Sequence, residues 1–126
     1  MRAVDTNVVV RLITRDDPRQ TAQAEAFVSK GGWLSQIVLV EVVWVLDAVF
    51  ELTHKQIALA VEMLVNLRDL VVQDPEVVAA ALLQYRRRPK VGFSDCLILE
   101  AARKAGHLPL GTFDRELAKL QGAERV

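Results

Sequence analysis

The sequence has one cysteine, two histidines and no net charge, and each of these excludes a kind of site or partner. The one cysteine, Cys96, excludes an internal disulfide, so we expect a reducing, cytoplasmic setting. The two histidines, His54 and His107, lie in unrelated segments and give no zinc-type spacing with it. The 16 basic residues balance the 16 acidic ones, so any contact with a polyanion requires a local patch.

Long apolar runs of the membrane-spanning kind are also missing. No run reaches the roughly 18 uncharged residues that a spanning helix needs, and the N-terminus, "MRAVDTNVVVRLITRDD", has no signal-peptide pattern. We therefore expect a protein that is neither exported nor embedded in a membrane. Hydrophobic residues still make up 52% of the 126 residues, which is typical of a folded globular chain. The length predicts a single domain over residues 1–126.

Short apolar segments alternate with helical patterns along the whole chain. The predicted strands cover residues 3–4, 33–35, 70–72 and 108–111, with an edge strand at the C-terminus. The predicted helices follow the first strand, span 17–29, 36–50, 53–68 and 74–85, and begin again at Ser94, with a brief final helix. This alternation predicts an α/β three-layer sandwich, a central parallel sheet with helices on both faces.

Residues typical of helix ends set several of these boundaries. Asp17, Pro18 and Gln20 match a capping box with proline in the first turn. Thr53 and Gln56 repeat the pattern, and Ser94 is the expected cap of the segment "SDCLILEAARKAG", which Gly106 ends.

Four acidic residues fall where a parallel sheet places its ligands, beyond the carboxyl ends of the strands. Asp5 follows the first predicted strand, and Asp114 follows the last clear one. Asp95 is expected at the first position of a helix, and Glu41 lies about one turn into another. Each aspartate also has a simpler interpretation, as a helix cap or a favourable first-turn charge.

Glu41 is the exception, because it is the one charged residue in the apolar run "QIVLVEVVWVL". A buried carboxylate without a partner is costly, and no Lys or Arg stands three or four residues away to pair with it. The alternative is that Glu41 faces water on a narrow polar stripe with Asp47. If the four acids converge, their repulsion favours a hard divalent cation with oxygen ligands, Mg²⁺ or Mn²⁺.

The motifs "VDTNVVVRL", the lone Glu41, "FSDCLILEAA" and "GTFDREL" together resemble the PIN-domain nucleases. In size and order of elements the chain is similar to the VapC-type toxins of toxin–antitoxin pairs. The resemblance implies a metal-binding and catalytic quartet: Asp5, Glu41, Asp95 and Asp114. It gives supporting roles to Thr6, Asn7 and Thr112, and an outer position to Glu116.

The activity that the resemblance implies is Mg²⁺-dependent hydrolysis of RNA, in tRNA or another structured RNA, leaving a 5′-phosphate and a 3′-hydroxyl. It also implies a cognate antitoxin and a homodimer, either of which fits the extended apolar surface of "IALAVEMLVNL"; a wholly internal helix is the alternative. The cations nearest the motifs either contact RNA or are solvated helix-end charges. They are Arg11 and Arg15, and the cluster Arg86, Arg87, Arg88 and Lys90.

Two other classes compete with a nuclease. Phosphoryl transfer of the haloacid-dehalogenase type also begins with an Asp after the first strand, but it needs a second Asp two residues later, where Asn7 stands. The third class is a non-catalytic α/β interaction module, in which the acids are only caps and surface charges.

Overall fold

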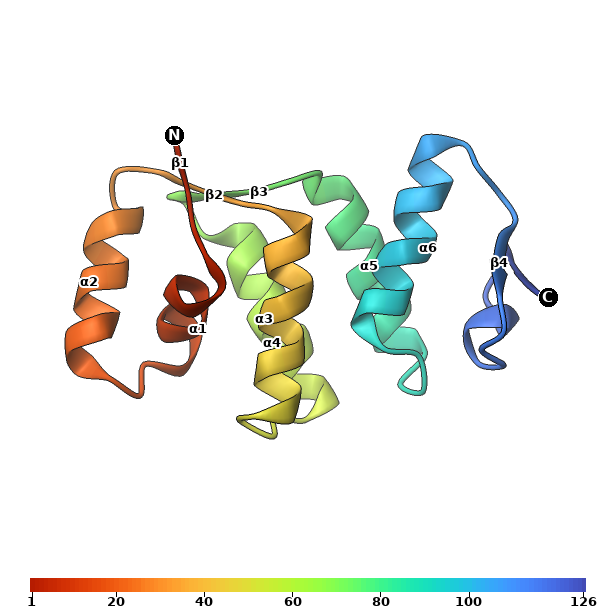
Figure 1. Cartoon of the computed structure of the whole chain (residues 1–126), viewed down its shortest axis with the longest axis horizontal. Coiled ribbons are helices and arrows are strands. Elements are labelled where there is room, and N and C mark those ends of the chain that lie inside the picture. The colour runs from red at the N-terminus through yellow and green to blue at the C-terminus, as the bar shows by residue number, and fades with distance from the viewer. The chain divides into compact units, whose positions relative to one another are not determined.

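The computed structural model describes all 126 residues, which divide into two compact units, Met1–Pro75 and Glu76–Val126. We call them the N-terminal and C-terminal units (Figure 1). The first holds β1 (Arg2–Ala3), α1 (Thr6–Thr14), α2 (Pro18–Val28), β2 (Gly32–Leu34), α3 (Gln36–Ala48), α4 (His54–Asn66) and β3 (Leu70–Val72). The second holds α5 (Pro75–Arg87, with Pro75 at the boundary), α6 (Phe93–Ala105), β4 (Leu110–Thr112), the 3₁₀ turn η1 (Leu117–Lys119) and β5 (Ala123–Arg125).

The sheet of the N-terminal unit is fully parallel, in the order β1-β2-β3. Trp33 is in register with Ala3 on one side and with Val71 on the other. All three carboxyl ends therefore meet at one edge, and α1 and α3 leave from that edge (Figure 1). The predicted α/β class with a parallel sheet is confirmed.

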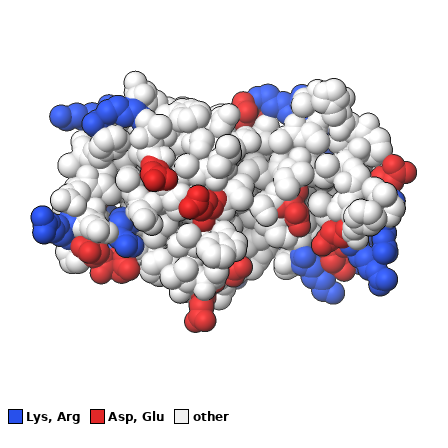
Figure 2. All heavy atoms as spheres, viewed as in Figure 1, with Lys and Arg blue, Asp and Glu red and all other residues white.

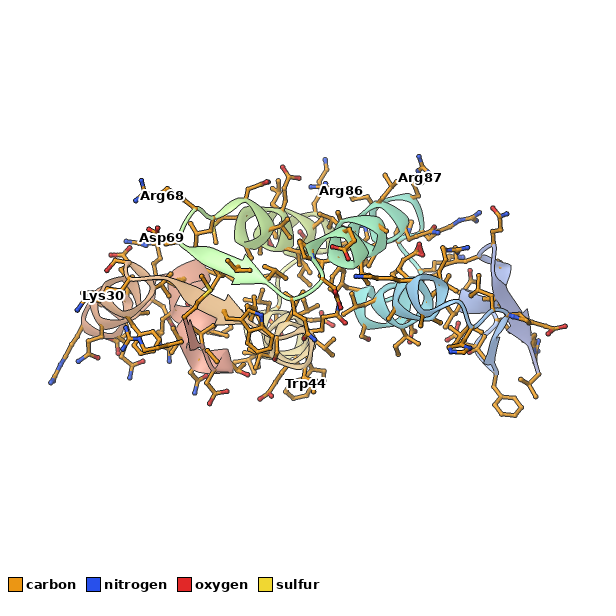
Figure 3. All side chains as sticks on the ribbon, turned by 90° about the horizontal axis from the view of Figure 1, so that it is seen from above. Lys30, Trp44, Arg68, Asp69, Arg86 and Arg87 are labelled. Atoms are coloured by element: carbon orange, nitrogen blue, oxygen red, sulfur yellow. The ribbon has the colours of Figure 1, made fainter.

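Helices cover this sheet on both sides, as the sequence predicts. Helix α4 packs against β3, and α1 packs against both α2 and α3. Viewed from above, α3 and α4 lie on opposite sides of the strands (Figure 3). Leucines of the strands and of both helix layers are fully buried between them: Leu34, Leu39, Leu46 and Leu64.

The start of α3 is fixed by two side chains. The hydroxyl of Ser35 accepts the N–H of Val38 at 3.1 Å, and the amide oxygen of Gln73 accepts the N–H of Gln36 at 2.9 Å. Gln73 also donates its backbone N–H to the carbonyl of Leu34 at 2.8 Å. The free N–H groups of the first turn are thus satisfied at the sheet edge, which fixes where the helix carrying Glu41 begins.

In the C-terminal unit, α5 buries one face, and β4 pairs in parallel with β5. The buried residues of α5 are the five that its spacing predicts: Val77, Val78, Ala81, Leu82 and Tyr85. The Tyr85 ring meets Phe93, the first residue of α6, edge to face with centroids 5.8 Å apart. Strand β4 is partly exposed, although the sequence predicts a buried one.

Two predicted caps need correction. Gly92, not Ser94, is the N-cap of α6, so Asp95 is the third residue of the helix rather than the first. Asp17 does accept the N–H of Gln20 at 3.0 Å, but the Gln20 side chain accepts from Arg11 instead of closing the box. The second predicted box, at the start of α4, is complete.

The six α-helices have at most 13 residues each, and none has the length and hydrophobicity needed to cross a membrane.

Gly106 ends α6 in the left-handed region, at φ 82°, and a methyl group there would meet no atom within 4 Å. We predict that Gly106→Ala lowers the free energy of unfolding by about 1 kcal/mol through backbone strain alone. Gly92 is the matched control on the same helix, because its φ of −64° suits any residue. Gly92→Ser should be neutral or stabilising by up to about 1 kcal/mol in urea unfolding. Equal effects at both glycines would contradict the assignment.

Candidate metal centre

Asp5 is the N-cap of α1, as its simpler interpretation predicts. Its Oδ1 accepts the backbone N–H of Thr6 at 2.7 Å, and the residue itself is exposed. Asn7, two residues further on, is exposed as well. The cap bond holds the carboxylate at the head of α1, where the N-terminal dipole favours its charge.

Thr6 differs from its two neighbours because it is buried, at 5% exposure. Its hydroxyl oxygen has no hydrogen-bond partner. A buried hydroxyl left unpaired costs free energy, and such groups call for an explanation at each occurrence. Thr6 directly follows Asp5 in the chain, and Asp5 is the residue that the sequence motif predicts as a metal ligand.

Glu41 is exposed, so the expectation that it is buried in an apolar run is wrong. Helix α3 buries Leu39, Val42 and Leu46 on its core face, while Glu41 stands on the opposite face. Water therefore satisfies Glu41, and a buried partner is not needed. Its candidacy as a ligand rests on its place in the motif and on its position in the sheet.

Asp5 and Glu41 belong to the same edge of the N-terminal sheet. The N–H of Val4 donates to the carbonyl of Trp33 at 2.9 Å, which aligns the end of β1 with the end of β2. Glu41 is five residues beyond Gln36, about 7.5 Å along α3. On this face, acidic side chains lie over α1 and α3 among uncharged atoms, and Lys and Arg gather toward α2 (Figure 2).

The C-terminal unit brings the other two acids close enough to interact. Burial raises the pKa of Asp95 above its ordinary value, and the negative charge of Asp114 raises it further. Asp95 is half-buried in the first turn of α6, whereas Asp114 is exposed after β4. The two carboxylates come from segments about 20 residues apart and repel each other, which is the environment that a cation relieves.

Asp114 is held by a compact turn. Its backbone N–H donates to the Thr112 hydroxyl at 3.0 Å, and its Oδ1 accepts the N–H of Leu117 at 2.8 Å. Thr112 thus supports Asp114 in the way the sequence motif suggests. Glu116, in the same turn, is half-buried and pairs with Lys119 at 3.1 Å. That pair stabilises the turn and occupies the Glu116 carboxylate.

Sequence inspection missed one buried carboxylate, Glu100, which is 8% exposed. It pairs with Arg103 at 3.1 Å, and Arg103 also donates to the carbonyl of Gln121 at 2.6 Å. The i, i+3 spacing of Glu100 and Arg103 is the signal that could have found this pair. Through Arg103, this ion pair joins α6 to the loop before β5. The role of Glu100 is therefore structural.

Cys96 follows Asp95 directly and is fully buried. Burial, together with the charges of Asp95 and Glu100, raises the pKa of its thiol to about 11. The thiol therefore stays protonated at neutral pH, and Cys96 is unsuited to act as a nucleophile.

The predicted cations divide into two groups. Arg11 pairs with Asp16 at 3.2 Å, and Arg15 pairs with Glu25 at 2.5 Å, so both are neutralised within the N-terminal unit. The cluster that ends α5 is exposed, and Arg86 and Arg87 point outward from the helix (Figure 3). Its other members are Arg88 and Lys90.

Each unit thus holds two of the four acidic motifs: Asp5 and Asp114 follow strands, Asp95 lies in the first turn of α6, and Glu41 lies in the second turn of α3. Across the chain, no three His, Cys, Asp or Glu side chains gather into a metal-holding group. An α/β protein with carboxylate motifs at strand ends belongs to the class in which oxygen ligands at a sheet edge serve phosphate chemistry.

Comparison with protein families matches residues 2–123 to the PIN domain. The chain therefore belongs to the PIN domain family, whose members are generally metal-dependent nucleases, hydrolases that act on nucleic acids. Divalent ions such as Mg²⁺ or Mn²⁺ are the typical cofactors of PIN nucleases. No curated protein matches the sequence significantly.

The repulsion between Asp95 and Asp114 predicts a test in metal-free protein. Because the pKa of Asp95 is raised in the folded state, its contribution to stability is greatest at acid pH and falls as the pH rises through that value. Asp95→Asn should therefore keep or raise the melting temperature at neutral pH in EDTA and remove this pH dependence. It should also remove most of the stabilisation that Mg²⁺ gives the wild type by binding the folded state.

Thermal unfolding at mildly acid and neutral pH, with EDTA and with Mg²⁺, measures both effects. Asp114→Asn is the companion variant, since it should lower the pKa of Asp95 while leaving the burial contribution. If Asp95 were only a favourable first-turn charge, its loss would cost about 0.3–1 kcal/mol. A lower melting temperature with an unchanged response to Mg²⁺ would therefore exclude Asp95 from the centre.

Proposed function

We propose that this protein is a VapC-type endoribonuclease toxin, which hydrolyses phosphodiester bonds of tRNA or another structured RNA in the cytoplasm. The observation that carries this proposal is that Asp95, half-buried in the first turn of α6, has its pKa raised by burial and also by the charge of Asp114, a second motif acid from a separate segment. PIN membership over residues 2–123 supports the nuclease activity, and the four motifs support the toxin class. We take residues 1–126 as one PIN domain to which both units contribute.

The donor set fits a hard divalent cation. All four motif residues are carboxylates, the oxygen ligands that Mg²⁺ and Mn²⁺ prefer, and the orphaned Thr6 hydroxyl beside Asp5 is a further polar group of the kind a metal-bound water would satisfy. We assign the ion to Asp5, Glu41, Asp95 and Asp114. When bound, such an ion lowers the pKa of a coordinated water and stabilises charge on the leaving oxygen.

The chain's own residues orient these ligands. The Thr6 N–H fixes Asp5, and the Leu117 N–H and the Thr112 hydroxyl fix Asp114. Asn7 would hydrogen-bond ligands or water through its exposed amide. Glu116 takes an outer position, since Lys119 already pairs with it. We assign phosphate contact to the cluster that ends α5, because its four cations lie close together in sequence and are exposed.

We predict that purified protein cleaves total tRNA or ribosomal RNA with Mg²⁺ or Mn²⁺ and not in EDTA, leaving 5′-phosphate and 3′-hydroxyl ends. Glu41→Gln should reduce cleavage by at least about 100-fold. Changes to residues that only support metal ligands cost about 10- to 100-fold, and Glu41 is proposed as a ligand itself. Asp47→Asn is the matched control, an exposed acid on the same helix outside the motifs, and should leave cleavage unchanged. Activity in EDTA, or 2′,3′-cyclic phosphate ends, would refute the mechanism.

We propose a homodimer and a cognate VapB-like antitoxin as the protein partners. On α4, Leu59 is 60% and Met63 is 39% exposed, so the apolar surface predicted there is partly uncovered. Met63 also lines a hollow of about 270 Å³ within the N-terminal unit, with Leu12, Val28 and Leu67 among its other walls. The rest of its lining is polar or charged: Arg15, Glu25, Ser29 and Asp69. A hollow of this mixed kind is suited to an amphipathic segment of the antitoxin.

We predict that Met63→Glu weakens antitoxin binding by at least about tenfold, an effect of about 1.4 kcal/mol. Leu83→Glu, at a 51% exposed site on α5, should leave that binding unchanged. The protein encoded beside this gene supplies the ligand for a calorimetric titration. Light scattering of the free chain tests the dimer, and a strict monomer whose Met63→Glu variant binds normally would contradict both partners.

A further inference from the structure

Helix α3 turns a largely apolar face outward on which Glu41 is flanked by large side chains. Ile37, four residues earlier, is 81% exposed, and Trp44, three residues later, is 64% exposed. The spacing places all three on one side of the helix. Trp44 projects away from the ribbon (Figure 3). An indole left this open on a folded chain marks an interaction site.

The C-terminal unit repeats this arrangement independently. Phe113 is 78% exposed and immediately precedes Asp114, whose turn is fixed by Thr112 and Leu117. Each unit therefore presents one uncovered aromatic ring beside a proposed metal ligand.

We propose that Trp44 and Phe113 are base-stacking residues, each of which packs against an unpaired nucleobase of the RNA substrate. This inference rests on the proposed function and deepens it, because it limits the cleaved segment to single-stranded or looped RNA. Bases inside a duplex are stacked on each other and offer no free face to a protein ring.

Distance supports this occupant. Trp44 lies about 4.5 Å along the helix axis from Glu41. A phosphate held near Glu41 therefore brings the base of its own or the next nucleotide within reach of the indole. Phe113 and Asp114 are consecutive residues, so their Cα atoms are about 3.8 Å apart, a separation that one nucleotide spans.

Charge favours a nucleobase over a protein surface at Trp44. A protein partner covering this face would bury the exposed Glu41 carboxylate between Ile37 and Trp44, and interface centres are depleted of such charges. The chain also has no net charge, and Arg11 and Arg15 are paired. Long-range attraction for RNA is therefore weak, and stacking adds affinity to the phosphate contacts assigned to the cluster that ends α5.

Binding in a cleavage-deficient Asp95→Asn background tests the proposal. The probes are a fluorescein-labelled oligouridylate and a blunt RNA duplex of the same length, followed by anisotropy with Mg²⁺ present. Trp44→Leu and Phe113→Leu should each weaken oligouridylate binding by about 5- to 100-fold. Trp44→Phe should retain most of the affinity, and Ile37→Ala, on the same face, should retain all of it. The duplex should bind weakly, with no effect of these variants.

Fluorescence reports the stacking directly, because the chain has two tryptophans, Trp33 and Trp44. With Trp33→Phe, the remaining Trp44 emission should be quenched by oligouridylate at the dissociation constant measured by anisotropy. With Trp44→Phe, the remaining emission of Trp33, in β2, should not change. Melting temperatures confirm that each variant is folded.

The possible failures are distinct. Unchanged affinity and KM in Trp44→Leu and Phe113→Leu, in a chain whose wild type cleaves RNA with Mg²⁺, would overturn the inference and leave the function standing. Loss of stacking and affinity in these variants, in a chain that cleaves nothing with any metal, would uphold the inference and refute the nuclease function. If Ile37→Ala and Trp44→Leu both change the oligomeric state, the face is a protein interface and the inference is wrong.

Discussion

The parallel register of β1, β2 and β3 decides where the helices of the N-terminal unit begin, and so where two of the four motif acids lie. Once Trp33 is aligned with Ala3 and with Val71, the three strands end together, and the chain must satisfy the N–H groups of each helix that starts there. It does so with side chains that belong to the same edge: Asp5 caps α1, and Ser35 and Gln73 hold the first turn of α3. A shift of one residue between strands would move both carboxylates and separate the caps from the groups they satisfy.

The carboxylates themselves fall into two electrostatic environments. Asp5 and Glu41 are exposed, so water stabilises their charges and little repulsion is stored in the N-terminal unit. Asp95 is half-buried, and the negative charge of Asp114 raises its pKa further, so the two carboxylates of the C-terminal unit repel each other. At acid pH, protonation of Asp95 removes this repulsion, and at neutral pH a bound cation would offset it. Being a helix cap does not exclude an acid from such a centre, because Asp5 accepts the N–H of Thr6 through Oδ1 alone and a carboxylate offers two oxygens.

The periodicity of apolar residues predicted which face of a helix is buried where the two faces differ in side-chain type. It failed where both faces of a helix are apolar. The five buried positions of α5 follow from their helical spacing, because the residues between them are mostly small or polar: Ala79, Ala80 and Gln84, with Leu83 the one large apolar exception. The run around Glu41 has no such contrast, since Ile37 and Trp44 are as apolar as the core residues, so its orientation was not predictable. The start of α6 was misplaced because Gly92, which has no capping side chain, is the N-cap, and Phe93, which packs against Tyr85 of α5, is already the first helical residue. Motif order predicted the acids of the site, but their burial and hydrogen bonds depend on tertiary packing that no local pattern encodes.

The apolar residues of the chain are therefore not all in the core. In α3 the residues that face inward and those that face outward are both hydrophobic, and a helix needs only one such face to fold. An exposed indole lowers solubility without adding to stability, so its presence beside Glu41 points to a use in binding. A nuclease without net charge cannot depend on long-range attraction to concentrate its substrate. Short-range contacts with bases then contribute a larger share of its affinity, and because bases must be unpaired to make them, affinity and the choice of substrate arise from the same side chains.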